Sequence, residues 1–256
     1  MTSFSACIVV GGSDRGRRRA RNEDSFVLLP EDGIAVVADG MGGHPGGDVA
    51  SRIAARATAD GLRQKLSSTA NATLEDRERA MRASVLEAHE AVLARSREEP
   101  SLLGMGTTTT AIALDITTGR YIVGNIGDSR TYRFRDGRLE QLTRDDTWLQ
   151  DRIDSGRIRR EDAMGHPEGH LLTQCIGLDQ TPVPRTVQGE AAPGDVFLLC
   201  SDGLMASLTD DDIVDVLERS LDGTAAGAER TVEALIGAAN AAGGRDNITV
   251  ALVAVP

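Results

Sequence analysis

The sequence is dominated by short apolar runs rich in β-branched residues, each bounded by turn-forming residues. Runs of this kind are typical of strands, because helices need longer stretches with a different period. The predicted strands are Cys7–Val10, Phe26–Leu29, Ile34–Ala38, Thr108–Leu114, Tyr121–Ile126, Thr131–Phe134, Val196–Cys200 and Ile248–Val255. Asp136-Gly137 favours a tight hairpin after Thr131–Phe134, because both residues tolerate positive φ. Hairpins join antiparallel strands, so antiparallel sheets are expected.

Periodic apolar positions predict helices between and after these strands. One stripe begins at Val49 and a second at Leu74. Later helices are expected at Asp210–Glu218, with Thr209 as N-cap, and at about Ala225–Ala241. Strands and helices in this order predict an α+β layered architecture, with antiparallel sheets covered by helices.

Residues 144–190 contain no clear strand and are rich in Gly and Pro. We interpret this stretch as a flap-like insertion over a functional edge and not as a separate domain. Residues 1–256 are therefore predicted to form a single domain.

The charge balance excludes some partners. There are 28 Lys and Arg against 39 Asp and Glu, a formal net charge of −11. A general nucleic-acid binder needs a basic face, so nucleic acid is not an expected partner. The same acidity argues at first sight against any anionic substrate.

Other features indicate the compartment. No apolar run approaches the roughly 20 residues of a membrane span, so no membrane insertion is expected. The apolar Cys7–Val10 precedes the basic Arg17–Arg19, which is the reverse of a signal peptide. The three cysteines are far apart and form no C-x-x-C motif, which fits a reducing compartment. A cytoplasmic location is predicted.

Aspartates lie at the ends of four predicted strands: Asp39, Asp128, Asp202 and Asp246. If these ends converge, the carboxylates can stay ionised together only when a cation lies between them. Oxygen ligands without Cys or His select Mg²⁺ or Mn²⁺. The alternative is that each Asp-Gly is simply a turn, and spacing alone does not decide between the two interpretations.

Two neighbouring segments also allow alternatives. The glycine-rich stretch 40–47 lacks the Lys-Ser/Thr of a P-loop, so close approach of backbone to a bound ion explains it better. The arginine-rich segment 15–21 precedes Glu23-Asp24, and such a run is often a solvated face or a nucleic-acid patch. One Arg held beside a metal cluster would instead bind phosphate oxygens bidentately.

These residues lie in motifs that occur in order along nearly the whole chain. The motifs are S-D-R-G-x-x-R-x-x-N-E-D (13–24), V-A-D-G-M-G-G-H (37–44), G-M-G-T-T (104–108), I-G-D-S-R (126–130), L-C-S-D-G-L (199–204) and G-x-D-N-I-T (244–249). In this the chain resembles the bacterial metal-dependent protein phosphatases of the PPM, or type-2C, family. One such motif is weak evidence, whereas six in order are specific.

The resemblance implies a four-layer α/β/β/α sandwich with a centre of two Mn²⁺ or Mg²⁺ ions at one edge. By position, Asp39 would bridge both ions, the Gly40 carbonyl would ligate the second, and Asp202 and Asp246 would complete the first. Glu23 and Asp24 would act through metal-bound waters, and Arg19 would bind the phosphate.

The chain also departs from the family pattern. Asp128 corresponds to a ligand of a third ion found in bacterial members, but Ala206 stands where the family often has a second acid for that ion. Met41 occupies the position at which some members have a proposed general acid. His44 is the remaining candidate for that role, with a structural loop residue as the alternative.

The implied reaction is hydrolysis of phosphoserine and phosphothreonine on proteins by direct attack of a metal-bridging hydroxide. A pseudophosphatase scaffold and a small-molecule phosphatase are the alternatives. Expected partners are phosphorylated proteins, including a Ser/Thr kinase or its targets, and the expected state is a monomer. Two divalent ions would also reverse the local field, so the net charge of −11 no longer excludes an anionic substrate.

Overall fold

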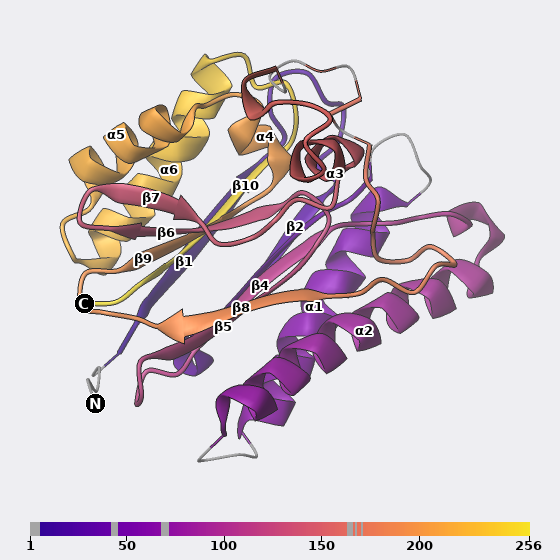
Figure 1. The fold of residues 1–256 in the computed structure, drawn as a ribbon, viewed down its shortest axis with the longest axis horizontal. Coiled ribbons are helices and arrows are strands. Elements are labelled where there is room, and N and C mark those ends of the chain that lie inside the picture. Colours follow the sequence, from indigo (N-terminus) through magenta and orange to yellow (C-terminus); the bar gives the residue numbers. More distant parts are fainter. Residues whose placement is uncertain (1–5, 42–45, 68–71, 163–165, 167, 170) are drawn as a thin grey trace.

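Two antiparallel sheets lie face to face, with helices on both outer faces (Figure 1). The computed structural model describes residues 6–41, 46–67, 72–162, 166, 168–169 and 171–256. This arrangement confirms the predicted α+β fold, a four-layer α/β/β/α sandwich.

Each sheet contains five strands in the described part of the chain. Sheet A has the order β1 (Ile8–Asp14), β10 (Ile248–Ala254), β9 (Val196–Cys200), β6 (Arg130–Arg135) and β7 (Arg138–Gln141). Sheet B has the order β2 (Asp24–Leu29), β3 (Ile34–Asp39), β4 (Thr109–Leu114), β5 (Arg120–Ile126) and β8 (Arg185–Glu190).

The helices form the outer layers. Sheet B is covered by α1 (Gly47–Ser67) and α2 (Leu74–Glu98), and sheet A by α5 (Asp210–Ser220) and α6 (Ala225–Ala241). Two short helices, α3 (Trp148–Asp154) and α4 (Asp202–Met205), lie at one end of the sandwich. The expected N-cap of α5 is confirmed, because the Thr209 side chain accepts from Asp212 N–H in a capping box.

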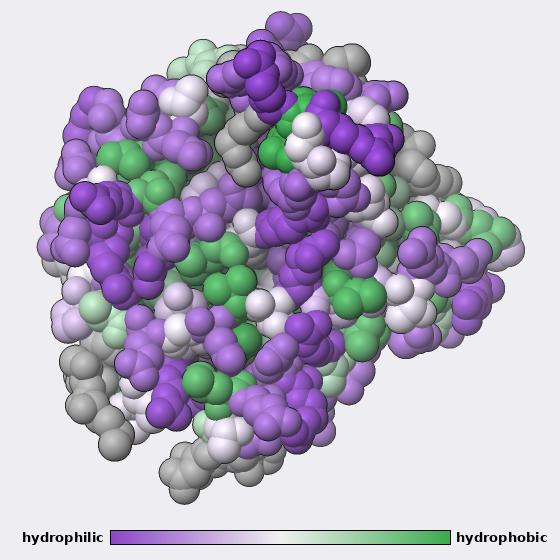
Figure 2. All heavy atoms as spheres, viewed as in Figure 1, coloured by the Kyte–Doolittle hydropathy of each residue, from purple (hydrophilic) through white to green (hydrophobic). Residues whose placement is uncertain are grey.

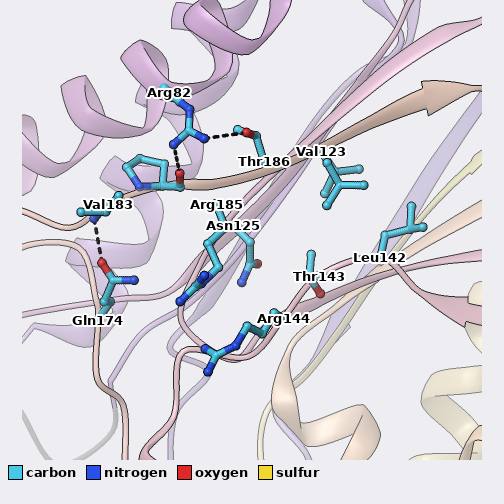
Figure 3. Close-up of a pocket in the computed structure, with 12 residues that line it drawn as sticks. Arg82, Val123, Asn125, Leu142, Thr143, Arg144, Gln174, Val183, Arg185 and Thr186 are labelled. Carbon is cyan, nitrogen blue, oxygen red and sulfur yellow. Dashed lines mark hydrogen bonds between the residues drawn. The ribbon is translucent and has the colours of Figure 1, made fainter. Parts of the chain in front are cut away.

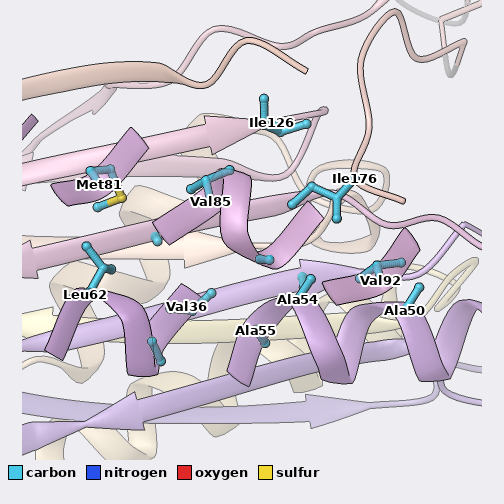
Figure 4. Close-up of a cluster of buried hydrophobic side chains, with 14 of the residues drawn as sticks. Val36, Ala50, Ala54, Ala55, Leu62, Met81, Val85, Val92, Ile126 and Ile176 are labelled. Carbon is cyan, nitrogen blue, oxygen red and sulfur yellow. The ribbon is translucent and has the colours of Figure 1, made fainter. Parts of the chain in front are cut away.

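Side-chain alternation along the strands explains the continuous apolar runs. In β3, Ile34 and Val36 pack against α1 and α2, whereas Ala35 and Val37 pack between the sheets. Both faces of the central strands are therefore buried, so both sets of positions need apolar residues. Figure 4 shows the cluster between sheet B and its helices, where Leu62 and Met81 are fully buried.

The structure corrects the expectation that residues 144–190 contain no strand. Residues Arg185–Glu190 form β8, which pairs with β5 over its whole length. This edge strand was missed because Val187 is its only large apolar residue, so it has no apolar alternation. The single domain with an insertion at 144–190 stays a prediction.

The other predicted strands are present, with ends that differ by a few residues. The largest difference is in β1, which continues to Asp14 because all seven of its residues pair with β10. The expected hairpin is confirmed: Asp136 and Gly137 have φ of 49° and 72° and join β6 to β7.

Hydrophilic residues cover most of the face seen in Figure 2, and hydrophobic residues appear there only in small scattered patches. In the described part of the chain, no helix combines the length and the apolar character needed to cross a membrane.

Candidate metal-dependent active site

The aspartate-bearing strand ends meet at one end of the sandwich. Asp39 ends β3, Asp202 follows β9, Asp246 precedes β10, and Asp128 lies between β5 and β6. A cavity of about 430 Å³ lies at this end. Its lining includes the predicted site residues Arg19, Glu23, Asp39, Gly40, Asp128, Asp202 and Asp246. Two candidates are not in this lining: Asp24, which is buried next to Asp39 in the β2–β3 ladder, and His44, which lies outside the described residues.

Strand register places Asp39 and Asp24 together on the inner face of sheet B. The two residues are direct partners in the β2–β3 ladder. Asp39 is two residues after Val37, which packs between the sheets, so its side chain points to the same side. A shift of either strand by one residue would turn its carboxylate away from sheet A.

Asp24 joins the two sheets behind the cavity. It is buried, and its Oδ2 accepts hydrogen bonds from Ser201 Oγ at 2.7 Å, directly after β9, and from Thr249 Oγ1 at 2.6 Å, in β10. Its Oδ1 is also buried but has no hydrogen-bond partner among the described residues. A buried carboxylate oxygen without a partner is costly, so this atom fits an outer-sphere role beside a hydrated cation.

Asn247 holds the arginine-rich loop against the start of β10. Its Nδ2 donates to the carbonyls of Arg15 and Arg21, at 2.9 and 2.8 Å, and its Oδ1 accepts from Glu23 N–H at 2.8 Å. Asn247 belongs to one of the six sequence motifs, but no role was predicted for it. Its position directly after Asp246 was the one signal of a role in the sequence. Its partners could not be predicted, because they lie more than 220 residues away along the chain.

Thr108 is a second positioning residue for which no role was predicted from the sequence. Its hydroxyl accepts from Asp39 N–H at 3.1 Å, and its own N–H donates to the Asp39 carbonyl at 2.9 Å. The hydroxyl also lies 2.7 Å from that of Ser129, next to Asp128. Thr108 therefore links two of the acidic loops.

Two glycines allow the backbone to approach closely here. A Cβ on Gly40 would lie 2.3 Å from the Gly47 carbonyl oxygen and 2.5 Å from that of Glu23. A Cβ on Gly203 would lie 1.9 Å from the Asn247 carbonyl oxygen. Both separations are too short for any larger residue, so these glycines set the spacing between the carboxylate loops.

The carboxylates repel one another across the cavity. Burial, followed by the charges of Asp24 and Asp202, raises the pKa of Asp39 well above its ordinary value. Burial and the Asp202 charge raise the pKa of Asp128 to about 8. Burial and the Asp246 charge raise the pKa of Asp202 to about 6. Burial raises the pKa of Asp24 to about 7, although hydrogen bonds from Thr249 and Ser201 oppose this.

Arg19 supplies positive charge at the rim of the cavity. Its Nη2 donates to Asp246 Oδ2 at 2.6 Å, and this hydrogen bond is the main cause of the raised pKa of Arg19. The side chain is 43% exposed, so the rest of the guanidinium faces solvent. Arg19 can therefore contact an anion in the cavity while its contact with Asp246 holds it in place.

The donor set fits Mg²⁺ or Mn²⁺. The cavity offers carboxylates and the Gly40 carbonyl, which are the hard oxygen ligands that these ions prefer. Within the described residues, no three Asp, Glu, His or Cys side chains form a ready set of ligands for one ion. Mg²⁺ usually keeps several bound waters, so protein side chains do not have to fill every position around it.

Evidence for a third ion is limited to Asp128. That residue lines the cavity, whereas Ala206 is exposed at the end of α4 and has no ligand atom in its side chain. The third ion stays a prediction.

The segment before β8 contributes the apolar wall of the cavity. Leu171, Leu172, Cys175 and Leu178 line it. Burial raises the pKa of the Cys175 thiol to about 11, which keeps it protonated and a poor nucleophile. Acidic residues that need a cation between them and apolar residues therefore line the same cavity.

Comparison with known proteins identifies the family. The model of the family described as protein phosphatase 2C matches residues 11–236. The serine/threonine phosphatase stp of Listeria welshimeri is 36% identical over 246 residues, which cover 94% of this chain and 93% of that protein. The serine/threonine protein phosphatase PstP of Mycobacterium tuberculosis is 39% identical over 244 residues, which cover 95% of this chain but 44% of PstP.

A solved structure agrees with this result. The catalytic domain of PstP in complex with two manganese ions is 36% identical, has a TM-score of 0.80 and covers 98% of each chain. Likeness in both sequence and fold over nearly the whole length leaves one assignment: this chain belongs to the protein phosphatase 2C family.

Proposed function

We propose that this protein is a Mg²⁺- or Mn²⁺-dependent protein serine/threonine phosphatase. The observation that carries the proposal is the meeting of Asp39, Asp202 and Asp246 beside Arg19 in one cavity. Their separate positions along the chain make such a meeting improbable unless the carboxylates act together. The phosphatase names of its relatives and the two manganese ions bound to the PstP catalytic domain support the same activity.

In the proposed site, Asp39 would contact both divalent ions, the Gly40 carbonyl would hold one of them, and Asp202 and Asp246 would hold the other. When bound, such a pair of ions activates water and neutralises the charge of a phosphoryl group. Glu23 and Asp24 are proposed to accept hydrogen bonds from water molecules around the ions. The unpartnered Oδ1 of Asp24 supports this role.

Arg19 is proposed to orient the phosphate. A guanidinium donates two parallel hydrogen bonds to phosphate oxygens, which holds the phosphorus atom in one direction. Its anchoring on Asp246 lowers the entropy lost when a substrate binds. The apolar wall at Leu172 and Leu178 limits water around the leaving side chain.

We also propose phosphorylated proteins as substrates, including a Ser/Thr kinase or its targets, and a cytoplasmic monomer as the working form. The pseudophosphatase alternative needs missing ligands, and the predicted ligands are present in the cavity. A small-molecule substrate gains no support from the relatives, whose names specify serine/threonine phosphatases.

The test is Asp39→Asn, assayed for Mn²⁺-dependent hydrolysis of a phosphothreonine peptide. The amide keeps the shape but loses the charge, so we expect a loss of kcat/KM of roughly 100-fold or more, with a retained fold. Asp215→Asn is the matched control, because Asp215 is 60% exposed on α5 and pairs only with Arg219 among the described residues. Full activity of Asp39→Asn would refute the proposed function.

A further inference from the structure

A second cavity of about 430 Å³ lies between β8 and the chain that follows β7. Figure 3 shows Arg82, Arg144 and Arg185 around it, with Gln174 on one side and Val123 and Leu142 on the other. Among the described residues that line it, three are arginines and none is acidic. In a chain with a net charge of −11, such a lining is unusual.

Shared lining residues link this cavity to the candidate active site. A smaller hollow of about 200 Å³ shares Leu172, Cys175 and Leu178 with the active-site cavity. The same hollow shares Gln174 with the arginine-lined cavity. The three hollows therefore follow one another along the segment before β8, as a groove for an extended chain would require.

Two of the three arginines are already used in the structure. Arg82 donates to Glu78, to the Pro184 carbonyl and to Thr186, so each of its nitrogens has a partner. Arg144 donates to Asp151, Asp154 and the Asp145 carbonyl. These two side chains shape the cavity but have little capacity left for a ligand.

Arg185 is different. Its Nε donates to Asp146 Oδ1 at 2.8 Å, and its two terminal nitrogens have no partner among the described residues. The side chain is 46% exposed. Asp146 is itself fixed, since its Oδ2 accepts from Gly127 N–H at 3.2 Å and its side chain is 1% exposed. Among the described residues, the two terminal nitrogens of Arg185 are therefore left to donate to a ligand at the end of the groove.

Gln174 adds a third donor. Its Oε1 accepts from Val183 N–H at 2.7 Å, which leaves its Nε2 without a partner among the described residues. Val183 and Val187, which are 67% and 37% exposed, provide apolar contact for the methylene part of a ligand. Donors beside a small apolar surface match the side chain of Glu or Asp.

We propose, on the basis of the proposed function, that this cavity binds an acidic side chain of the substrate protein close to the phosphorylated residue. Arg185 and Asn125 are partners in the β5–β8 ladder, and Asn125 lies three residues before Asp128. At about 3.4 Å per residue and about 4.8 Å between strands, Arg185 lies roughly 11 Å from the acidic loops. An extended substrate covers that distance in about three to four residues.

The test uses the full chain with Mn²⁺ and matched phosphothreonine peptides. One set has Glu three or four positions from the phosphothreonine, on either side, and the control set has Gln there. For one of these positions we expect the wild type to prefer Glu by about threefold to tenfold in kcat/KM. The preference should appear mainly in KM, because the acid acts in binding.

Arg185→Ala should reduce the Glu/Gln ratio to about one, and Arg185→Lys should give an intermediate ratio. Using the ratio cancels any general damage to the active site. Arg120→Ala is the matched control, because Arg120 is 41% exposed and pairs with Glu190 at the opposite end of the same two strands. That variant should keep the wild-type ratio.

Each result decides the proposal. A wild-type ratio near one at every position would refute the acidic subsite while leaving the phosphatase function intact. A ratio unchanged by Arg185→Ala would also refute it, since another group would then read the acid. If no phosphothreonine peptide is hydrolysed although a small phosphate ester is, both this inference and the protein-phosphatase function fail.

Discussion

Replacing Gly203 with alanine tests whether the spacing between the acidic loops controls activity. Gly203 follows Asp202, and its Cα faces the carbonyl of Asn247, which follows Asp246. The new methyl group would therefore separate the two strand ends that carry predicted metal ligands.

The geometry sets the size of the effect. The added Cβ would lie 1.9 Å from the Asn247 oxygen, whereas Cβ atoms essentially never approach another heavy atom within 3.0 Å. The loops must therefore move apart by at least about 1.1 Å. A misplacement of about 1 Å costs roughly 100-fold in rate, and overpacking costs about 1–3 kcal/mol of stability.

The assay measures kcat/KM on a phosphothreonine peptide, Mn²⁺ affinity by calorimetry, and thermal unfolding. Gly237→Ala is the matched control, because Gly237 lies inside α6 and a Cβ added there would have no neighbouring atom within 4 Å. That change should stabilise the protein by up to about 1 kcal/mol through helix propensity and leave activity unaltered. Wild-type activity and Mn²⁺ affinity in Gly203→Ala would refute the reasoning.

Two further predictions concern stability. Arg77 on α2 forms an ion pair with Asp115, and the two side chains are 9% and 20% exposed. Arg77→Met leaves the carboxylate of Asp115 without this partner, so the free energy of unfolding measured by chemical denaturation should fall by about 3 kcal/mol. Burial acts to raise the pKa of Asp115, but hydrogen bonds from Thr118 and Thr117 and the charge of Arg77 hold it below its ordinary value. The ion pair therefore stabilises the fold above about pH 4. The difference in free energy of unfolding between wild type and variant should become smaller as the pH falls further. A difference that does not change with pH would contradict this. The second prediction concerns the metal: Mn²⁺ at about 100 times its Kd should raise the free energy of unfolding of the wild type by about 2.7 kcal/mol, and a chelator should reverse this. An equal gain in Asp39→Asn would show that the ion binds elsewhere.

The sequence was informative wherever local chemistry decides structure. The hairpin at Asp136-Gly137 and the cap at Thr209 depend on a few neighbouring residues, and both were predicted correctly. β8 was not predicted, because an exposed edge strand is specified by its pairing with β5 and not by its own residues. The short helix α3 was missed for a similar reason, since its seven residues contain no buried position in the structure.

For the site too, some features follow from the sequence and others only from the tertiary structure. The sequence by itself determined which strands end in aspartate and, through six ordered motifs, the family to which the chain belongs. Only the tertiary structure brought Asp24 onto the hydroxyls of Ser201 and Thr249 and linked Asn247 to the arginine-rich loop. It alone showed Arg185 at the end of a groove that begins at the acidic loops. These contacts join residues that are distant in the chain, so they depend on how the two sheets and the segment before β8 pack, which no local pattern encodes.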